Sequence, residues 1–144
     1  MKLPITKIRP EAQLPEYKTK GSVGFDLAAS ETVTIQPKTI AMIPTGLVTK
    51  VPDGHMLMVC SRSSTPMKKG LTPPHGVGIL DQDYCGPNDE IKILTYNFLD
   101  TPVTVEKGER IAQGVIVKIE QCEIVDSPIT TQDDRGGFGS TGVN

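Results

Sequence analysis

Apolar and polar residues alternate with a period of two in several short stretches of the chain. The clearest is Thr32-Val33-Thr34-Ile35, and residues 47–51 follow the pattern more loosely. Because successive side chains of an extended strand point to opposite sides, this alternation predicts strands with one buried face. Residues 55–60 are a mostly apolar run of strand length, and residues 90–93, 103–105 and 115–119 are further short stretches that suit strands.

Turn-forming residues separate these stretches. The chain has 12 prolines and 14 glycines in 144 residues, which favours frequent turns and argues against long helices. The only helical candidate is 64–69, where Pro66 suits a first turn and Gly70 suits a C-terminal stop. The sequence therefore predicts an all-β fold, an antiparallel β-sandwich or barrel with one short helix.

The length of the chain is that of one domain. Residues 1–127 carry the strand pattern and form the predicted β domain, and residues 128–144 form a polar C-terminal arm. Such an arm could complete shared sites in a cyclic oligomer if its target lies on another subunit.

Charge and cysteine content narrow the expected partners. The formal net charge is −2 and no basic run is longer than Lys68-Lys69, so we expect no nucleic-acid partner. We expect no membrane partner, because neither a membrane span nor a signal peptide is recognisable. The three cysteines lack CxxC spacing and suit a reducing cytosol, which predicts a cytoplasmic protein.

Two segments combine polar groups that often bind anions or cap turns. Gly24-Phe25-Asp26-Leu27 places a lone acid after an aromatic residue at a strand start, where a turn former or cap is the ordinary interpretation. Arg62-Ser63-Ser64 places a cation and two hydroxyls before the short helix, an arrangement that suits an anion. An ordinary serine cap beside a surface arginine remains the alternative.

The segment 76–86 pairs two acids with an aromatic ring between glycines. Asp81 and Asp83 would share one face of an extended strand and Tyr84 would oppose them, unless a tight turn intervenes. A hairpin with an unpaired backbone edge could read a pyrimidine, and Tyr84 could stack under its sugar and leave no room for a 2′-hydroxyl. The alternative is a hairpin with solvated acids.

Two further segments complete the set. In Lys107-Gly108-Glu109-Arg110-Ile111-Ala112-Gln113, we expect Gln113 to share a face with Ile111 and to need hydrogen-bond partners, and Glu109 and Arg110 to form a solvated pair. The tail 135–142 joins a cation, a ring, glycines and hydroxyls, which suits a lid over a nucleotide triphosphate. A disordered polar tail is the alternative.

In order and spacing, these five segments resemble the trimeric deoxyuridine triphosphatase (dUTPase) family across nearly the whole chain. Val23–Leu27 resembles the family's AGxDL pattern, and Arg62-Ser63-Ser64 resembles RSG/RSS. Gly78–Gly86 resembles GVIDxDYxG, and Gly108–Gln113 resembles GDRIAQ. The family's GGFGSTG is present unchanged from Gly136 to Gly142.

The resemblance implies a jelly-roll-like β fold, a homotrimer with three shared sites, and Mg²⁺ bound mainly through the triphosphate. It implies hydrolysis of dUTP to dUMP and pyrophosphate by attack of water on the α-phosphorus, which keeps uracil out of DNA and supplies dUMP for dTMP synthesis. Asp81 would orient and deprotonate the water.

The resemblance also assigns roles to the substrate-binding residues. Arg62, Ser63, Ser64 and Gln113 would hold phosphates, and Asp26 would act on Mg²⁺ through a water molecule. Backbone groups of Gly78, Ile79 and Leu80 would read uracil, and Tyr84 would exclude ribose. From the arm, Phe138 would cap the uracil, and Arg135, Gly139, Ser140 and Thr141 would close on the phosphates.

The chain departs from the family pattern at three places. Arg135 directly precedes Gly136, which brings the cation two residues closer to the ring than in most members. Residues 87–89 are inserted after the third motif. His75 stands where several members have Asn, and it could bond a uracil carbonyl or be a loop histidine without a ligand role. Lys92 falls near a position that contacts uracil through its backbone.

Two other functions fit the same fold. A dCTP deaminase-like enzyme would need an acid on the strand after the third motif, and residues 91–95 contain none. A non-catalytic nucleotide-binding regulator would need none of the catalytic groups, whereas Asp81, Arg62 and Gln113 occur together.

Overall fold

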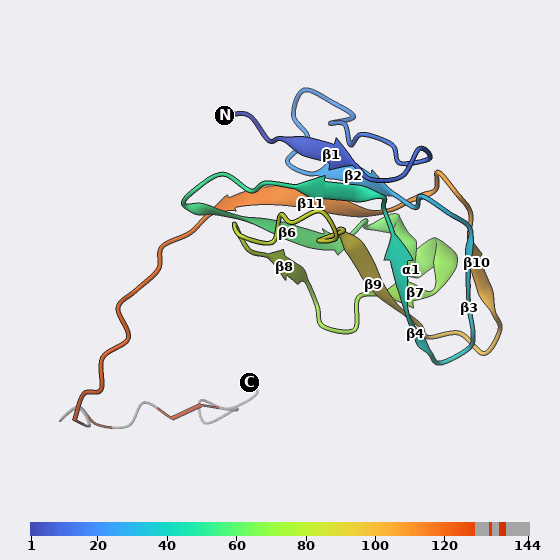
Figure 1. Cartoon of the computed structure of the whole chain (residues 1–144). Helices are drawn as coiled ribbons and strands as arrows, with labels where there is room; N and C mark the ends of the chain where they lie inside the picture. Colours follow the sequence, from blue (N-terminus) through green and yellow to red (C-terminus); the bar gives the residue numbers. More distant parts are fainter. Residues whose placement is uncertain (129–132, 134–135, 138–144) are drawn as a thin grey trace.

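Short antiparallel strands and one short helix make up the part of the chain that the structure describes. The computed structural model describes residues 1–128, 133 and 136–137 (Figure 1). The elements are β1 (Ile5–Lys7), β2 (Phe25–Ala28), β3 (Val33–Ile35), β4 (Ile40–Pro44), β5 (Leu47–Thr49), β6 (His55–Ser61), α1 (Ser64–Lys69), β7 (Leu71–Thr72), β8 (Gly78–Leu80), β9 (Lys92–Asn97), β10 (Val103–Val105) and β11 (Arg110–Lys118).

The strands form four sheets in which neighbouring strands run antiparallel. The largest sheet has the order β2-β11-β6-β8, so β2 and β8 are its edges. A second sheet has the order β4-β9-β7, and the pairs β1-β5 and β10-β3 complete the set. The prediction of an all-β fold with one short helix is confirmed.

Aliphatic side chains fill the core between these sheets. The largest fully buried residues include Leu27 on β2, Leu57 on β6, Ile35 on β3 and Ile43 on β4. Phe25 is the aromatic residue of the buried cluster. Each buried Leu or Ile side chain stabilises the fold by about 1.5–3 kcal/mol relative to an exposed one, so the core holds the two larger sheets in a fixed relationship.

Several predicted elements match the observed ones closely. The predicted helix 64–69 and the predicted strand 103–105 coincide with α1 and β10. Gly70 ends α1 with φ 65° and donates its N–H to Pro66 O at 3.0 Å. Its missing side chain also makes room for Leu99, whose Cγ lies 2.3 Å from where a Cβ would be. The helix stop at Gly70 is therefore fixed locally and by packing.

Other observed strands begin or end at different residues from those predicted. The strand predicted over 90–93 begins only at Lys92, because Glu90 N–H donates to Asn88 O at 2.9 Å and keeps that residue in a turn. Residues 115–118 of the predicted strand 115–119 form the end of β11, which begins at Arg110. β1, β4 and β7 had no counterpart among the predicted strands. Among the described residues, no helix combines the length and apolar character needed to cross a membrane.

Candidate active site

Three polar side chains lie in one row across the largest sheet. Asp26 on β2 is the register partner of Gln113 on β11, and Gln113 is the register partner of Cys60 on β6. Antiparallel partners point to the same face of a sheet. The segments 23–27 and 108–113 therefore lie side by side in the sheet, although they are far apart in the sequence.

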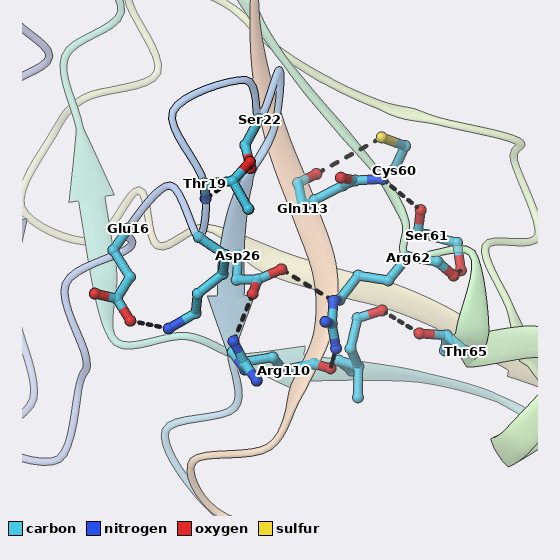
Figure 2. Close-up of polar contacts among 12 residues, drawn as sticks. Glu16, Thr19, Ser22, Asp26, Cys60, Ser61, Arg62, Thr65, Arg110 and Gln113 are labelled. Carbon is cyan, nitrogen blue, oxygen red and sulfur yellow. Dashed lines mark hydrogen bonds and ion pairs between the residues drawn. The ribbon is translucent and has the colours of Figure 1, made fainter.

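Asp26 connects two arginines at the end of this row. Its Oδ1 lies 2.9 Å from Arg62 Nε, and its Oδ2 accepts from Arg110 Nη1 at 2.8 Å (Figure 2). Arg62 Nη1 donates to the carbonyl of Arg110 at 2.9 Å. The Asp26 side chain is only 12% exposed, so these pairs are partly shielded from water. The carboxylate therefore fixes the direction of both guanidinium groups.

A β-bulge brings Arg110 to this face. The pairing of β11 with β2 shifts between Arg110 and Ala112, so one extra residue is accommodated. Ile111 and Ala112 are both buried, whereas Arg110 is exposed and Gln113 is half-buried. The predicted shared face of Gln113 and Ile111 is therefore wrong.

The predicted Glu109–Arg110 pair is also wrong. Glu109 accepts from Lys69 Nζ at 2.9 Å, and Arg110 bonds Asp26 instead. Sequence reasoning missed Arg110 as a site residue, and its presence in the fourth motif, three positions before Gln113, was the available signal.

Gln113 has defined neighbours in the sheet. Its Nε2 donates to Ser61 O at 3.1 Å, and the Cys60 thiol lies 3.8 Å from the Gln113 carbonyl (Figure 2). A Cβ on Gly24 would lie 2.6 Å from Gln113 Oε1, so the glycine of the first motif leaves the space that this side chain occupies. Burial raises the pKa of the Cys60 thiol, which keeps it protonated beside the carbonyl.

Basic side chains surround a hollow beside Arg62. Its volume is about 460 Å³, and it lies between α1 and the start of β11. Thr65 Oγ1 donates to Ile111 O at 2.8 Å and so fastens α1 to that strand. Ser63, at the N-cap of α1, makes no side-chain capping bond. The hollow is lined by Arg62, Ser64, Thr65, Lys68, Lys69, Gly108, Glu109, Arg110 and Ile111. Four cations against one acid give it a positive character that suits phosphates.

A second cavity, of about 380 Å³, lies beside the edge strand β8. It brings together seven residues that the sequence predicted for catalysis and base recognition, and adds two that it did not, Met42 and Glu90. The predicted residues are His75, Gly78, Ile79, Leu80, Asp81, Tyr84 and Lys92. In the sequence Glu90 directly follows the insertion 87–89, and nothing there indicated its position in this wall.

A tight turn follows β8 and decides how the acids and the ring are placed. Tyr84 N–H donates to Asp81 O at 3.4 Å, and Cys85 N–H donates to Asp83 O at 2.9 Å. Asp81 and Tyr84 consequently line the same cavity, and Asp81 also lines a neighbouring hollow with Asp83 and His55. The turn thus brings Tyr84 to the cavity that Asp81 lines, where an extended strand would have opposed the two residues, and it leaves Asp81 and Asp83 beside one hollow.

The arginine cluster and the cavity beside β8 lie at opposite ends of β6. Leu57 pairs with Leu80, and Met56 and Asp81 line one hollow, so Asp81 lies near the start of the strand. Arg62 follows its end. Six residues of strand span about 20 Å, and Figure 1 shows β8 and α1 toward different ends of β6. The described residues of one chain thus keep Asp81 apart from the arginine cluster.

The chain beyond β11 leaves the domain. Ile119 N–H still donates to Gly54 O at 2.9 Å, but residues 120–128 are exposed and Ile124 is 97% exposed. Figure 1 shows this segment extending away from the sheets. The predicted site residues Arg135, Phe138, Gly139, Ser140 and Thr141 lie outside the described residues.

The described residues contain no cluster of three or more His, Cys, Asp or Glu side chains that could hold a metal ion. Both oxygens of Asp26 already accept from guanidinium groups. A Mg²⁺ ion at this site would therefore need most of its ligands from phosphate oxygens and water, which is the usual way this ion is bound with nucleotides.

Comparison with known proteins gives one consistent result. The dUTPase family model matches residues 10–142. The deoxyuridine 5'-triphosphate nucleotidohydrolase of Hydrogenobaculum sp. (strain Y04AAS1) is 41% identical and is covered over 99% of each chain. The protein of the same name from Helicobacter pylori (strain P12) is 39% identical, with 100% of this chain and 99% of that one covered.

Solved structures share the fold. The dUTPase of Staphylococcus bacteriophage 80alpha with dUPNHPP superposes with a TM-score of 0.87 at 27% identity, over 99% of both chains. The dUTPase from Streptococcus mutans gives a TM-score of 0.78 at 34% identity, over 84% of this chain and 98% of that one. The predicted jelly-roll-like class is confirmed. With its motifs, fold and relatives in agreement, the chain belongs to the dUTPase family.

Proposed function

We propose that this protein hydrolyses dUTP to dUMP and pyrophosphate, and so keeps uracil out of DNA and supplies dUMP for dTMP synthesis. The observation that carries the proposal is the cavity beside β8, where Asp81, Tyr84 and an unpaired strand edge line one space. The family and the names of the curated relatives support the same activity.

The cavity suits a pyrimidine deoxynucleotide. Among the strands of the described residues, β8 pairs only with β6, so its outer edge can offer backbone donors and acceptors to uracil. Gly78, Ile79 and Leu80 supply those groups, and Lys92 lies in the same wall. His75 Nε2 lies 3.4 Å from where a Cβ on Gly78 would be, so the imidazole stands beside the strand that would read the base. The ring of Tyr84 forms the wall on which the sugar would stack.

Asp81 is the proposed general base. It is exposed and lines the cavity, so it can accept a hydrogen bond from a water molecule beside the substrate. The water oxygen forms a bond to the α-phosphorus, its proton moves to the carboxylate, and the bond to the bridging oxygen of the β-phosphate breaks. Pyrophosphate leaves with that oxygen.

Arg62, Ser63, Ser64 and Gln113 are the proposed phosphate donors. Arg62 uses Nε for Asp26 and Nη1 for the Arg110 carbonyl, which leaves Nη2 for a phosphate oxygen. Charge-assisted bonds of this kind stabilise the charge that develops on the leaving group.

Mg²⁺ is the proposed cofactor and would enter with the triphosphate. When bound, the ion would neutralise phosphate charge and hold the phosphates in line. Asp26 could still accept a bond from a water of the ion through the lone pairs that its two arginine bonds leave free. Its principal task in this proposal is to hold Arg62 and Arg110.

A homotrimer is the proposed assembly. One chain keeps Asp81 about 20 Å from the arginine cluster, so a neighbouring copy is needed to complete a site. An apolar face next to the cavity supports this assembly: Ile40 and Met42 on β4 are 57% and 61% exposed, beside their register partners Tyr96 and Leu94 on β9. Exposed apolar patches of this kind commonly form subunit interfaces.

The division into a β domain, residues 1–127, and an arm, residues 128–144, is part of the proposal. The arm would bring Arg135, Phe138, Gly139, Ser140 and Thr141 to a site and exclude water from it. The cytoplasm is the proposed location, since Cys60, Cys85 and Cys122 are all free thiols, as expected in a reducing compartment.

Pyrophosphate release from dUTP, dCTP, dTTP and UTP tests the activity. We expect release with dUTP and little with the other three. Ammonia release from dCTP would indicate the deaminase-like alternative, and tight dUTP binding without turnover would indicate the regulator. Sedimentation of the purified full chain tests the trimer independently.

A further inference from the structure

The ring of Tyr84 is hydrogen-bonded to Glu90, the residue that directly follows the insertion 87–89. Its hydroxyl donates to the backbone carbonyl of Glu90 at 3.2 Å, and both residues line the cavity beside β8. Tyr84 is 39% exposed, so its hydroxyl bond rather than tight packing limits the movement of the ring.

The side chain of Glu90, the residue whose carbonyl accepts from Tyr84, is itself anchored. It is only 5% exposed, and its Oε1 accepts from Gly46 N–H at 2.7 Å. Arg9 approaches both oxygens, with Nε 3.3 Å from Oε1 and Nη2 3.4 Å from Oε2. Because a buried carboxylate is costly without such donors, the side chain cannot leave this position without a penalty.

The inserted residues close into a compact turn that joins the ring to this anchor. Gly86 N–H donates to Asp89 Oδ2 at 2.6 Å, and Asp89 N–H donates to Gly86 O at 3.1 Å. The N-terminal segment contributes as well, since Ile8 N–H donates to Gly46 O at 2.9 Å. The segment from Tyr84 to Glu90 is therefore held at its tip by the turn and at its end by Arg9 and Gly46.

We propose that Glu90 and Arg9 are positioning residues for Tyr84, and that through the Tyr84 hydroxyl they set the discrimination between deoxyribonucleotides and ribonucleotides. This inference rests on the proposed function. An aromatic ring can exclude the 2′-hydroxyl of a ribonucleotide only when the ring itself is held in position to within about 0.5 Å. Tyrosine has two side-chain torsions, and the bond to the Glu90 carbonyl fixes the far end of the ring.

The test measures kcat/KM for dUTP and for UTP in the full-length protein with Mg²⁺, and compares the ratio of the two between variants. The ratio is internal to each sample, so a smaller folded fraction does not change it. Tyr84→Phe removes only the hydroxyl, and we expect the dUTP/UTP ratio to fall by roughly fivefold or more, as for the loss of one hydrogen bond.

Arg9→Gln should also lower the dUTP/UTP ratio. If Arg9→Gln does not fold, Glu90→Gln is measured instead. The double variant Arg9→Gln/Tyr84→Phe should have the ratio of Tyr84→Phe alone, because the arginine acts through the hydroxyl bond. Glu31→Gln is the matched control for Arg9, since Glu31 contacts Arg9 Nη1 at 3.0 Å on the exposed side. Tyr17→Phe is the control for the lost hydroxyl, since its ring packs edge-on against Phe25.

An unchanged ratio in Tyr84→Phe would overturn the inference, and so would an additive effect of Arg9→Gln in the double variant. Both results leave a parent protein that prefers dUTP, so the proposed function would stand. A parent protein that releases no pyrophosphate from dUTP would overturn the proposed function itself, and the inference with it.

Discussion

Arg110 bonds Asp26 at 2.8 Å across a bulge that turns its side chain out of the core. The same carboxylate holds Arg62 at 2.9 Å, so the two arginines share one anion. Two cations placed together would repel each other without it. The cluster is thus a preorganised unit in which each member depends on the other two.

Arg110→Gln should therefore weaken the handling of phosphates more than the binding of the base. We expect kcat/KM for dUTP to fall by about 10- to 100-fold, in the range for a lost charged hydrogen bond. Calorimetry should find much weaker binding of a non-hydrolysable dUTP analogue and nearly unchanged binding of deoxyuridine. Equal losses for both ligands would show that Arg110 supports the fold generally.

Asp81→Asn should reduce kcat by about 10²- to 10⁴-fold, the usual contribution of a general base. The amide keeps the size of the side chain but cannot take a proton from water. The dUTP analogue should bind about as well as before, because the turn 81–84 is held by backbone bonds such as Tyr84 N–H to Asp81 O. A kcat close to that of the parent would remove Asp81 from the mechanism.

Gly24→Ala should act through Gln113. The new Cβ would lie 2.6 Å from Gln113 Oε1, so the amide must move away from its bond to Ser61 O. We expect about a tenfold loss in kcat/KM, in line with a displaced charge-assisted donor. In a Gln113→Ala background the same substitution should have little further effect, because the side chain that it displaces is already absent. Additive losses would place the role of Gly24 elsewhere.

A chain that ends at Pro128 should remain folded and assembled. Residues 120–128 are exposed, so the segment that leads from β11 into the arm adds little to the core of the β domain. If the arm closes the site, the shortened chain should keep the Tm and sedimentation of the parent and lose about 100-fold in kcat, as expected when reacting groups are no longer held in place. Unfolding of the shortened chain would assign the arm a structural role instead.

The sequence by itself determined the β architecture and the short helix, and it named the candidate site residues. Period-two alternation reports which residues face a core, and it located β10 and, to within one residue, β3. Turn chemistry located α1, because Pro66 and Gly70 act on their immediate neighbours. Arg62, Asp81, Tyr84 and Gln113 could be named as candidates because their motifs are contiguous in the sequence, and their roles stay predictions.

Only the tertiary structure decided which of these groups meet. Arg110 bonds a residue 84 positions away, and Arg9 bonds one 81 positions away, so no local pattern reports either pair. The bulge in β11 changes which side chains face outward, and a pattern with a fixed period cannot register one extra residue. Strand register and loop closure depend on the packing of the whole chain, and for that reason Glu90 and Arg110 could be placed only once the sheets were assembled.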